Sequence, residues 1–315
     1  MASVSSLGEM RLIERFARHI SRPRDVRVGI GDDTAVIRWP SGQALLFASD
    51  MLVEGVHFRL AATAGRAAAR RGQGRLAPYW IGWKALACNI SDVAAMGGEP
   101  AYAVVSLGVP PATPIRVVDE LYRGLRACAA RFSMAIVGGD TVRAPQLVVD
   151  VGIIGRAHPA QIVRRSGARV GDLIYVTGRL GGSLASGKHA RFLPRVREAQ
   201  WLVRHVRVRA MMDLSDGLAS DLGQMARAGR VRLRVEEALI PVASAAGSAR
   251  QALMDGEDFE LLFVVSPAEA PRLPARVGNV PLTRIGTVAA RGAGVELVQR
   301  NGHIVPLTPT GFKHF

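Results

Sequence analysis

Gly29-Ile30-Gly31-Asp32-Asp33-Thr34-Ala35 sets two adjacent carboxylates in a glycine-flanked turn. Neighbouring aspartates repel each other, and a turn needs at most one Asp to bond its own backbone, so folding alone does not require the pair. A bound cation would explain it, whereas the simpler interpretation is a polar surface turn between strands. Aspartates beside Gly, Ser or Thr recur further along the chain, and that recurrence favours the cation.

The composition predicts a globular protein with reduced cysteines. With 315 residues and 49 % apolar composition, the chain is long enough for two domains, or one large one, with a buried core. No apolar run approaches the length of a membrane span and the N-terminus lacks a signal-peptide core, so we expect a cytoplasmic protein with no membrane partner. Cys88 and Cys128 lie in apolar segments without the paired spacing of a zinc site or a disulfide framework.

The charge does not by itself identify a nucleic-acid-binding protein. The chain has 41 basic and 26 acidic residues, a net charge of +15, and basic surfaces attract phosphate backbones. Only Lys84, Lys188 and Lys313 are lysines, so nearly all basic residues are arginine, which fits a compositional bias of the genome. No basic run is interleaved with aromatic residues, so we expect no nucleic-acid partner. An anionic small molecule remains compatible with the charge.

The apolar pattern predicts strands and helices that alternate in two halves. We expect helices at 80–96, 117–132, 195–206 and 218–228, and strands at 44–48, 101–109, 135–137, 147–154, 173–177 and 259–265. Asp216 or Ser215 is expected to cap the helix that begins at Leu218. The segment 157–171 contains Pro159 and a polar arginine-rich stretch, so we divide the chain into domains at 1–158 and 159–315.

The acidic residues share a setting that indicates a divalent cation. Each lies at the end of an element or in an apolar segment, beside Gly, Ser or Thr: Asp32, Asp33, Asp50, Asp92, Asp140, Asp213 and Asp216. Magnesium takes one or two carboxylates per ion and leaves positions for water and substrate phosphates, so several such residues imply several ions. Any single one of them could equally be a solvated or capping Asp.

Seven motifs in a fixed order resemble the thiamine-monophosphate kinase family. They are GIGDDTA at 29–35, SD at 49–50, GWKALACNISDVAAMGGEP at 82–100, GGDT at 138–141, RSGARVGD at 165–172, DLSDGL at 213–218 and GEDFEL at 256–261. The resemblance covers nearly the whole chain, and the family belongs to the superfamily of aminoimidazole ribonucleotide synthetase. It implies a two-domain α/β (α+β) fold, in which the N-terminal sheet forms a barrel across a homodimer and the C-terminal half is an α/β sandwich.

The resemblance also implies an activity, the Mg²⁺-dependent transfer of the ATP γ-phosphate to thiamine monophosphate. The acceptor is already ionised at neutral pH, so it needs no general base, and an aspartate-rich, histidine-poor cleft suits the neutralisation of two anions. We expect direct in-line transfer without a phospho-enzyme, because the sequence offers no obvious covalent nucleophile.

Roles are implied residue by residue at the positions that match the family. Asp33, Asp50, Asp92, Asp140 and Asp213 match catalytic magnesium ligands, with Asp32 and Ser49 beside them and Asp216 on a further ion. Positions expected to contact ATP are Tyr122, Gly139, Asp140, Arg165 and Ser215. His57, Glu257 and Phe312 match positions that line the thiamine site.

Two positions depart from the family pattern. Ala48 replaces a hydroxyl residue next to Ser49, and Asp255 adds negative charge close to the expected acceptor pocket. Two other interpretations stay open. One is another ATP-dependent synthetase or ligase of the superfamily, which would release free phosphate, and the other is a non-catalytic nucleotide-binding or nucleic-acid-binding protein.

Overall fold

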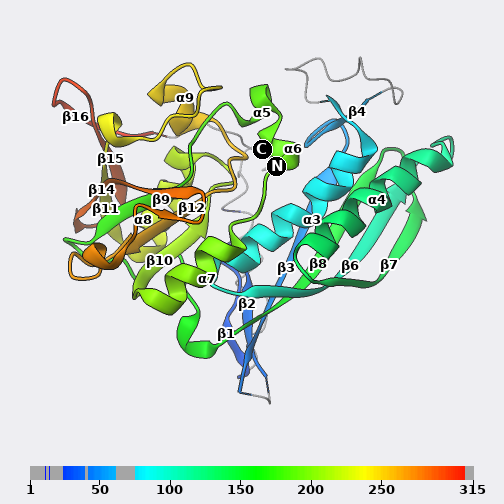
Figure 1. Ribbon diagram of the computed structural model, residues 1–315, viewed down its shortest axis with the longest axis horizontal. Coiled ribbons are helices and arrows are strands. Elements are labelled where there is room, and N and C mark those ends of the chain that lie inside the picture. Colours follow the sequence, from blue (N-terminus) through cyan, green and yellow to red (C-terminus); the bar gives the residue numbers. More distant parts are fainter. Residues whose placement is uncertain (1–10, 12–13, 15–23, 40–41, 62–74, 309–315) are drawn as a thin grey trace, which may run out of the picture.

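The computed structural model describes residues 11, 14, 24–39, 42–61 and 75–308 of the chain. Its first half is built on a six-stranded sheet with the order β1-β2-β3-β8-β6-β7 (Figure 1). Adjacent strands are antiparallel except for β6 and β7, which are parallel. These strands are β1 (Val26–Val28), β2 (Ala35–Arg38), β3 (Ala44–Val53), β6 (Glu99–Val109), β7 (Ala135–Arg143) and β8 (Val148–Ala157). A separate pair consists of β4 (Arg59–Leu60) and β5 (Arg75–Leu76).

Two helices cover one face of this sheet, α3 (Pro78–Ala95) and α4 (Ile115–Arg131). Most of α3 is apolar and buried on all sides, which is typical of a helix inside a core. Two glycines let the helices pack backbone to backbone, because a Cβ on Gly82 would lie 1.9 Å from the Leu121 carbonyl oxygen and one on Gly124 would lie 1.8 Å from that of Tyr79. The first core fills the space between α3, α4 and the sheet.

The second half contains an eight-stranded sheet with the order β10-β12-β9-β14-β11-β15-β16, and β13 pairs with β14. The strands are β9 (Leu173–Thr177), β10 (Val208–Asp213), β11 (Val231–Glu236), β12 (Leu261–Val265), β13 (Arg276–Val277), β14 (Val280–Arg291), β15 (Gly294–Val298) and β16 (Ile304–Pro306). The α-helices are α5 (Ser183–Ser186), α6 (Lys188–Arg191), α7 (Val196–His205), α8 (Leu218–Gly229) and α9 (Ala249–Met254). Three 3₁₀ turns are η2 (Pro159–Gln161), η3 (Glu237–Leu239) and η4 (Ala270–Arg272).

The two halves meet along α3, which contacts α6, α7 and β10 (Figure 1). The Trp83 indole Nε1 donates a hydrogen bond to the Phe192 carbonyl oxygen at 3.0 Å. Phe192 and Phe259, both from the second half, stack with ring centroids 3.9 Å apart and belong to the core of the first half. The contact between the halves is therefore continuous with the hydrophobic core and holds α3 against residues near 260.

The four predicted helices are confirmed within two residues, and the strand at 173–177 is confirmed at both ends. Two strands, β3 and β7, continue five and six residues past their predicted ends at 48 and 137. β3 continues to Val53 because β8 pairs with it along its whole length, so Ser49 and Asp50 lie inside a strand and not at its end. β7 continues to Arg143 beside β6 and takes Asp140 into the sheet. The β8–β9 connection runs from 158 to 172, and the domain division at 158/159 stays a prediction.

Strand alternation gives the first sheet a second face, which no helix of the described residues covers. Apolar side chains on this outer face are about half exposed: Phe47, Met51, Tyr102 and Val104. Cys88 and Cys128 are both buried and free, as expected of core residues. Of the helices in the described part of the chain, none is long and apolar enough to cross a membrane.

Candidate functional site

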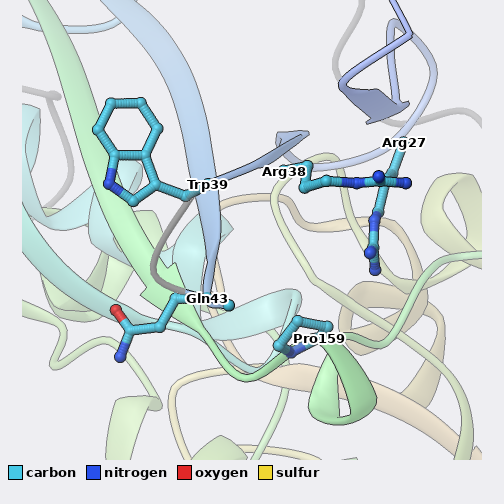
Figure 2. A pocket seen from close by; sticks show the side chains of 6 residues that line it. Arg27, Arg38, Trp39, Gln43 and Pro159 are labelled. Carbon is cyan, nitrogen blue, oxygen red and sulfur yellow. The ribbon is translucent and has the colours of Figure 1, made fainter.

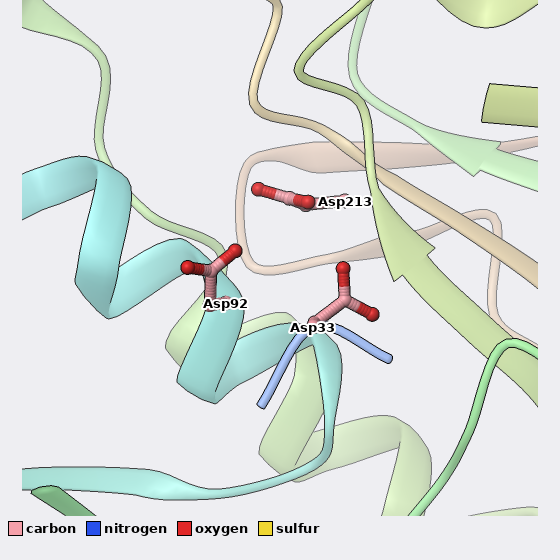
Figure 3. A group of neighbouring side chains, drawn as sticks. All are labelled: Asp33, Asp92 and Asp213. Carbon is pink, nitrogen blue, oxygen red and sulfur yellow. The ribbon is translucent and has the colours of Figure 1, made fainter. Parts of the chain in front are cut away.

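Three aspartates from distant parts of the chain converge between the two halves. Asp33 follows β1, Asp92 lies in the last turn of α3, and Asp213 ends β10. Each offers a carboxylate oxygen, and these oxygens all lie within 4.8 Å of one another. Figure 3 shows the carboxylates of Asp33 and Asp92 directed towards Asp213. Asp33 and Asp213 are buried and Asp92 is partly buried, so solvent screens this charge poorly.

The pKa values reflect this crowding of carboxylates. Burial raises the pKa of Asp213 to about 7, and repulsion from Asp33 adds to the effect. Burial also raises the pKa of Asp92 well above its usual range, followed by repulsion from Asp50 and Asp213. The Ser91 hydroxyl donates to Asp213 Oδ2 at 2.6 Å and opposes the shift. The pocket therefore disfavours three ionised carboxylates unless a cation joins them.

Further aspartates surround this group. Burial raises the pKa of Asp32 to about 6, and the adjacent Asp33 contributes. Asp50 points from β3 towards the same side, and its pKa is also raised to about 6, first by burial and then by Asp33, Asp150 and Asp216. The predicted acidic residues 32, 33, 50, 92, 213 and 216 therefore form one electrostatic cluster.

Arg165 is the cation that the described residues bring to this cluster. Its Nη2 contacts Asp33 Oδ1 at 2.7 Å, and its backbone N–H donates to Asp32 Oδ1 at 3.1 Å. Burial alone would lower the pKa of Arg165, but its ion pair and hydrogen bond with Asp33 raise it above its usual value. Three buried atoms here have no hydrogen-bond partner among the described residues: Arg165 Nε, Asp33 Oδ2 and the neighbouring Thr34 Oγ1. A cleft with one spare donor and one spare carboxylate oxygen is suited to a ligand that carries both phosphate and metal.

Two residues of α8 form hydrogen bonds to Arg165 and Asp216, and neither was predicted from the sequence. The Gln224 side chain accepts from Arg165 Nη1 at 2.8 Å and donates to Asp216 Oδ2 at 2.9 Å. Asp221 accepts from the Asp216 backbone N–H at 3.2 Å. The cap prediction is wrong, because Gly217 is the N-cap of α8, its φ of 106° is one that glycine tolerates, and no side chain caps it. The spacing of Asp221 and Gln224 on an amphipathic helix could have indicated these contacts.

About two helical turns before Asp92, three segments of the chain meet at Lys84 of α3. This lysine is completely buried, and its Nζ forms an ion pair with Glu257 and a 3.3 Å hydrogen bond to the His57 carbonyl oxygen. The His57 ring Nδ1 accepts from the Val53 backbone N–H at 3.0 Å. Two of the predicted thiamine-site residues are therefore joined, and the third, Phe312, lies outside the described residues. A lysine in an apolar helix of an arginine-rich chain was the available signal for Lys84.

Several predicted residues lie elsewhere. Asp140 is exposed in β7, in register with Ser106 of β6 on the outer face of the sheet. The Ser49 hydroxyl is also on that face and donates to Asp150 Oδ1 at 2.9 Å, so neither side chain joins the three aspartates within one chain. Gly139 cannot be replaced without strain, because a Cβ there would lie 1.8 Å from the Val105 carbonyl oxygen.

The other predicted contacts serve the fold in this structure. Tyr122 of α4 is partly buried and packs against the first core. Ser215 accepts the Glu257 backbone N–H at 2.7 Å through its carbonyl oxygen. The Asp255 carboxylate accepts the Gly182 N–H at 2.7 Å, which gives its extra negative charge a partner. The proposed contacts of Tyr122 and Ser215 with ATP stay predictions.

A surface hollow of about 510 Å³ lies apart from the predicted site residues. Its lining is Arg27, Arg38, Trp39, Gly42, Gln43 and Pro159. Figure 2 shows Trp39 and Gln43 on one side of this hollow and the two arginines on the other. The side chains therefore do not converge on one point, and the hollow contributes nothing to the site between the halves.

Comparison with known proteins matches both halves of the chain. Residues 31–157 match the N-terminal domain of the family "AIR synthase related protein", and residues 169–298 match its C-terminal domain. The thiamine-monophosphate kinase of Rhodopirellula baltica is 37 % identical over 307 residues, which covers 92 % of each chain. That of Bacillus subtilis is 32 % identical over 338 residues, 98 % of this chain and 100 % of the relative.

Solved structures agree with this match. The structure described as AaThiL complexed with AMPPCP and TMP superposes with a TM-score of 0.84 at 27 % identity, and covers 100 % of this chain and 99 % of that one. A hydrogenase maturation protein HypE superposes with a TM-score of 0.69 at 19 % identity over 93 % of this chain and 96 % of that one, which shows a shared fold alone. The expected two-domain fold of the AIR synthase type is thereby confirmed.

Proposed function

Because this chain belongs to the AIR synthase related proteins and, within them, to the thiamine-monophosphate kinase family, we propose that it transfers the ATP γ-phosphate to thiamine monophosphate and forms thiamine diphosphate. The observation that carries the proposal is the convergence of Asp33, Asp92 and Asp213 beside Arg165. Phosphoryl transfer between two polyanions requires such a site, since positioning and charge neutralisation supply most of its catalysis.

The residues present fit magnesium. Asp33 Oδ2 is buried and receives no hydrogen bond from the residues that the structure describes. Carboxylate oxygens of three residues lie within 4.8 Å of one another, which is a hard oxygen donor set. Asp33, Asp92 and Asp213 would hold the cation directly, with Asp32, Asp50 and Asp216 next to them. Asp140 and Ser49 retain their proposed roles as ligands on the family resemblance alone. Bound Mg²⁺ would neutralise the phosphate charges that the aspartates cannot accommodate by themselves.

The residues of the chain orient the two substrates. Arg165 can present a guanidinium N–H to a phosphate oxygen, because its Nε has no hydrogen-bond partner within the described part of the chain. The acceptor phosphate is itself the nucleophile and is ionised at neutral pH, so the proposed transfer is direct and needs no proton acceptor. His57 and Glu257 would line the thiamine side of the cleft, and Gly139, Tyr122 and Ser215 the ATP side.

The proposed functional unit is a homodimer located in the cytoplasm. Its support is the outer face of the first sheet, where Phe47 and Met51 are about half exposed and no helix in the described part of the chain covers them. An exposed apolar patch of this kind is typical of an interface, and a second copy would pack its own outer face against it.

The test is an assay with purified protein, ATP, Mg²⁺ and thiamine monophosphate. We expect ADP and thiamine diphosphate in equal amounts. Release of free phosphate without thiamine diphosphate would favour a synthetase or ligase, and salt-sensitive DNA binding without ATP consumption would favour a binding protein. Incubation of the enzyme with labelled ATP should leave no label on a side chain. A phospho-enzyme that forms at the turnover rate would contradict direct transfer.

A further inference from the structure

Lys84 is a charged residue inside the hydrophobic core, where a charge usually adds little to the stability of the fold. Its side chain is completely buried, whereas the side chain of its partner Glu257 is 34 % exposed. Removing an ammonium group from water costs several kcal/mol unless it is paired, and apolar residues of similar size are often as stable in such places. The apolar packing of α3 therefore gives no reason by itself for a lysine at this position.

Glu257 is fixed from two sides. Its backbone has a φ of 62°, in the left-handed region that non-glycine residues seldom adopt, and its N–H donates to the Ser215 carbonyl oxygen at 2.7 Å. Its side chain is held by Lys84 through Oε1. Oε2 accepts no hydrogen bond from the described residues. Strain at a partly exposed carboxylate with a spare oxygen is characteristic of a ligand contact.

The register of α3 relates this pair to the aspartate cluster. Lys84, Cys88 and Asp92 are four residues apart in succession, so they follow one side of the helix. At 1.5 Å per residue, Lys84 and Asp92 are separated by about 12 Å along the axis. A small molecule whose phosphate lay at Asp92 would meet Glu257 with its other end if it extended by about this length along α3.

We propose that Lys84 is a positioning residue that holds the Glu257 carboxylate, and through it the acceptor end remote from the phosphate. The inference rests on the proposed function. Thiamine carries a cationic thiazolium and an aminopyrimidine with two N–H donors, and a fixed carboxylate oxygen recognises both features. Lys84 also binds the His57 carbonyl oxygen, so one ammonium group sets the geometry of both segments.

The test compares two acceptors in the wild type and in Lys84→Met, Lys84→Arg and Glu257→Gln. The first acceptor is thiamine monophosphate, and the second is hydroxyethylthiazole phosphate, which lacks both the aminopyrimidine and the positive charge of the thiazolium ring. We expect Lys84→Met to lower kcat/KM for thiamine monophosphate about 10- to 100-fold, mainly through KM, as for a lost hydrogen bond to a charged group. KM for ATP and kcat/KM for the short acceptor should change less than about threefold, and Lys84→Arg should restore part of the loss.

Two further measurements separate positioning from a structural role. Calorimetry without ATP should show thiamine monophosphate bound more weakly by Lys84→Met, and the double variant with Glu257→Gln should be no worse than either single one. The matched control is Lys188→Met, which removes the 2.8 Å ion pair between Lys188 and Glu260 and should affect both acceptors alike. Equal losses with both acceptors in Lys84→Met would overturn the proposal. A wild type that forms no thiamine diphosphate would instead refute the proposed function.

Discussion

Asp213→Asn should stabilise the metal-free protein and inactivate it at the same time. In the fold the pKa of Asp213 is about 7, against an ordinary value of 3.8. At about 1.4 kcal/mol per pKa unit, ionising this carboxylate at pH 8 destabilises the fold by at most about 4 kcal/mol. Asparagine removes the charge and can still accept the Ser91 hydroxyl bond. At pH 5 the folded carboxylate is protonated, so the expected gain shrinks to about 2 kcal/mol.

The assay is urea unfolding of wild type and Asp213→Asn in EDTA at pH 8 and pH 5, repeated with Mg²⁺. We expect the variant to be more stable at pH 8, to lose part of this advantage at pH 5, and to gain less from Mg²⁺ than the wild type. Its transfer rate should fall at least about 100-fold.

Asp172→Asn is the matched control. Asp172 is also buried, but its carboxylate accepts the Arg169 N–H at 2.8 Å and lies 3.7 Å from Arg209 Nε. Its replacement should destabilise the fold by about 1–3 kcal/mol and leave the effect of Mg²⁺ unchanged. The reasoning is refuted if Asp213→Asn is less stable than wild type in EDTA at pH 8, or if Mg²⁺ stabilises both proteins equally.

Three other predictions follow from the same geometry. Gln224→Leu removes the link between Arg165 and Asp216, so KM for ATP should rise about 3- to 30-fold while KM for the acceptor stays within about twofold; equal changes in both would contradict the link. Burial raises the pKa values of Asp32 and Asp50 to about 6, so the metal-free fold favours their protonated forms. Their contribution to the free energy of unfolding is therefore complete below pH 4 and is lost as the pH rises through 6. The melting temperature in EDTA should therefore fall between pH 4 and pH 7, and Mg²⁺ should raise it more at pH 8 than at pH 5. A melting temperature in EDTA that stays constant from pH 4 to pH 7 would contradict this prediction. Phe47→Glu on the outer face should yield monomers in analytical ultracentrifugation, and an unchanged mass would remove the support for that dimer interface.

The sequence predicted the elements best where one periodicity extends over many residues. The apolar character of α3 and the amphipathic pattern of α4 fixed both helices within two residues. The strands β3 and β7 were predicted too short, because their polar ends, Ser49-Asp50 and Gly138-Gly139-Asp140, match turn chemistry when read alone. Pairing with β8 and β6 outweighs that local preference, since each added residue satisfies ladder hydrogen bonds.

The sequence was sufficient to predict the acidic residues of the site, but it did not predict which other side chains contact one another there. The aspartates at 33, 92 and 213 could be grouped by their unusual settings, and they do converge. Lys84 and Gln224 gave weaker signals, a lysine in an apolar helix and a polar residue on an amphipathic helix, and neither signal identifies the residue that the side chain contacts. Their importance comes from neighbours more than 50 residues away in sequence, Glu257 and Arg165, which only the tertiary structure brings near.

The most direct test of the central claim follows the labelled γ-phosphate of ATP in the presence of thiamine monophosphate and Mg²⁺. We predict that the label appears in thiamine diphosphate, that EDTA abolishes the transfer, and that Asp213→Asn transfers the label at least about 100-fold more slowly at the same Mg²⁺ concentration. Transfer at the wild-type rate in Asp213→Asn, or label found only in free phosphate, would contradict the account.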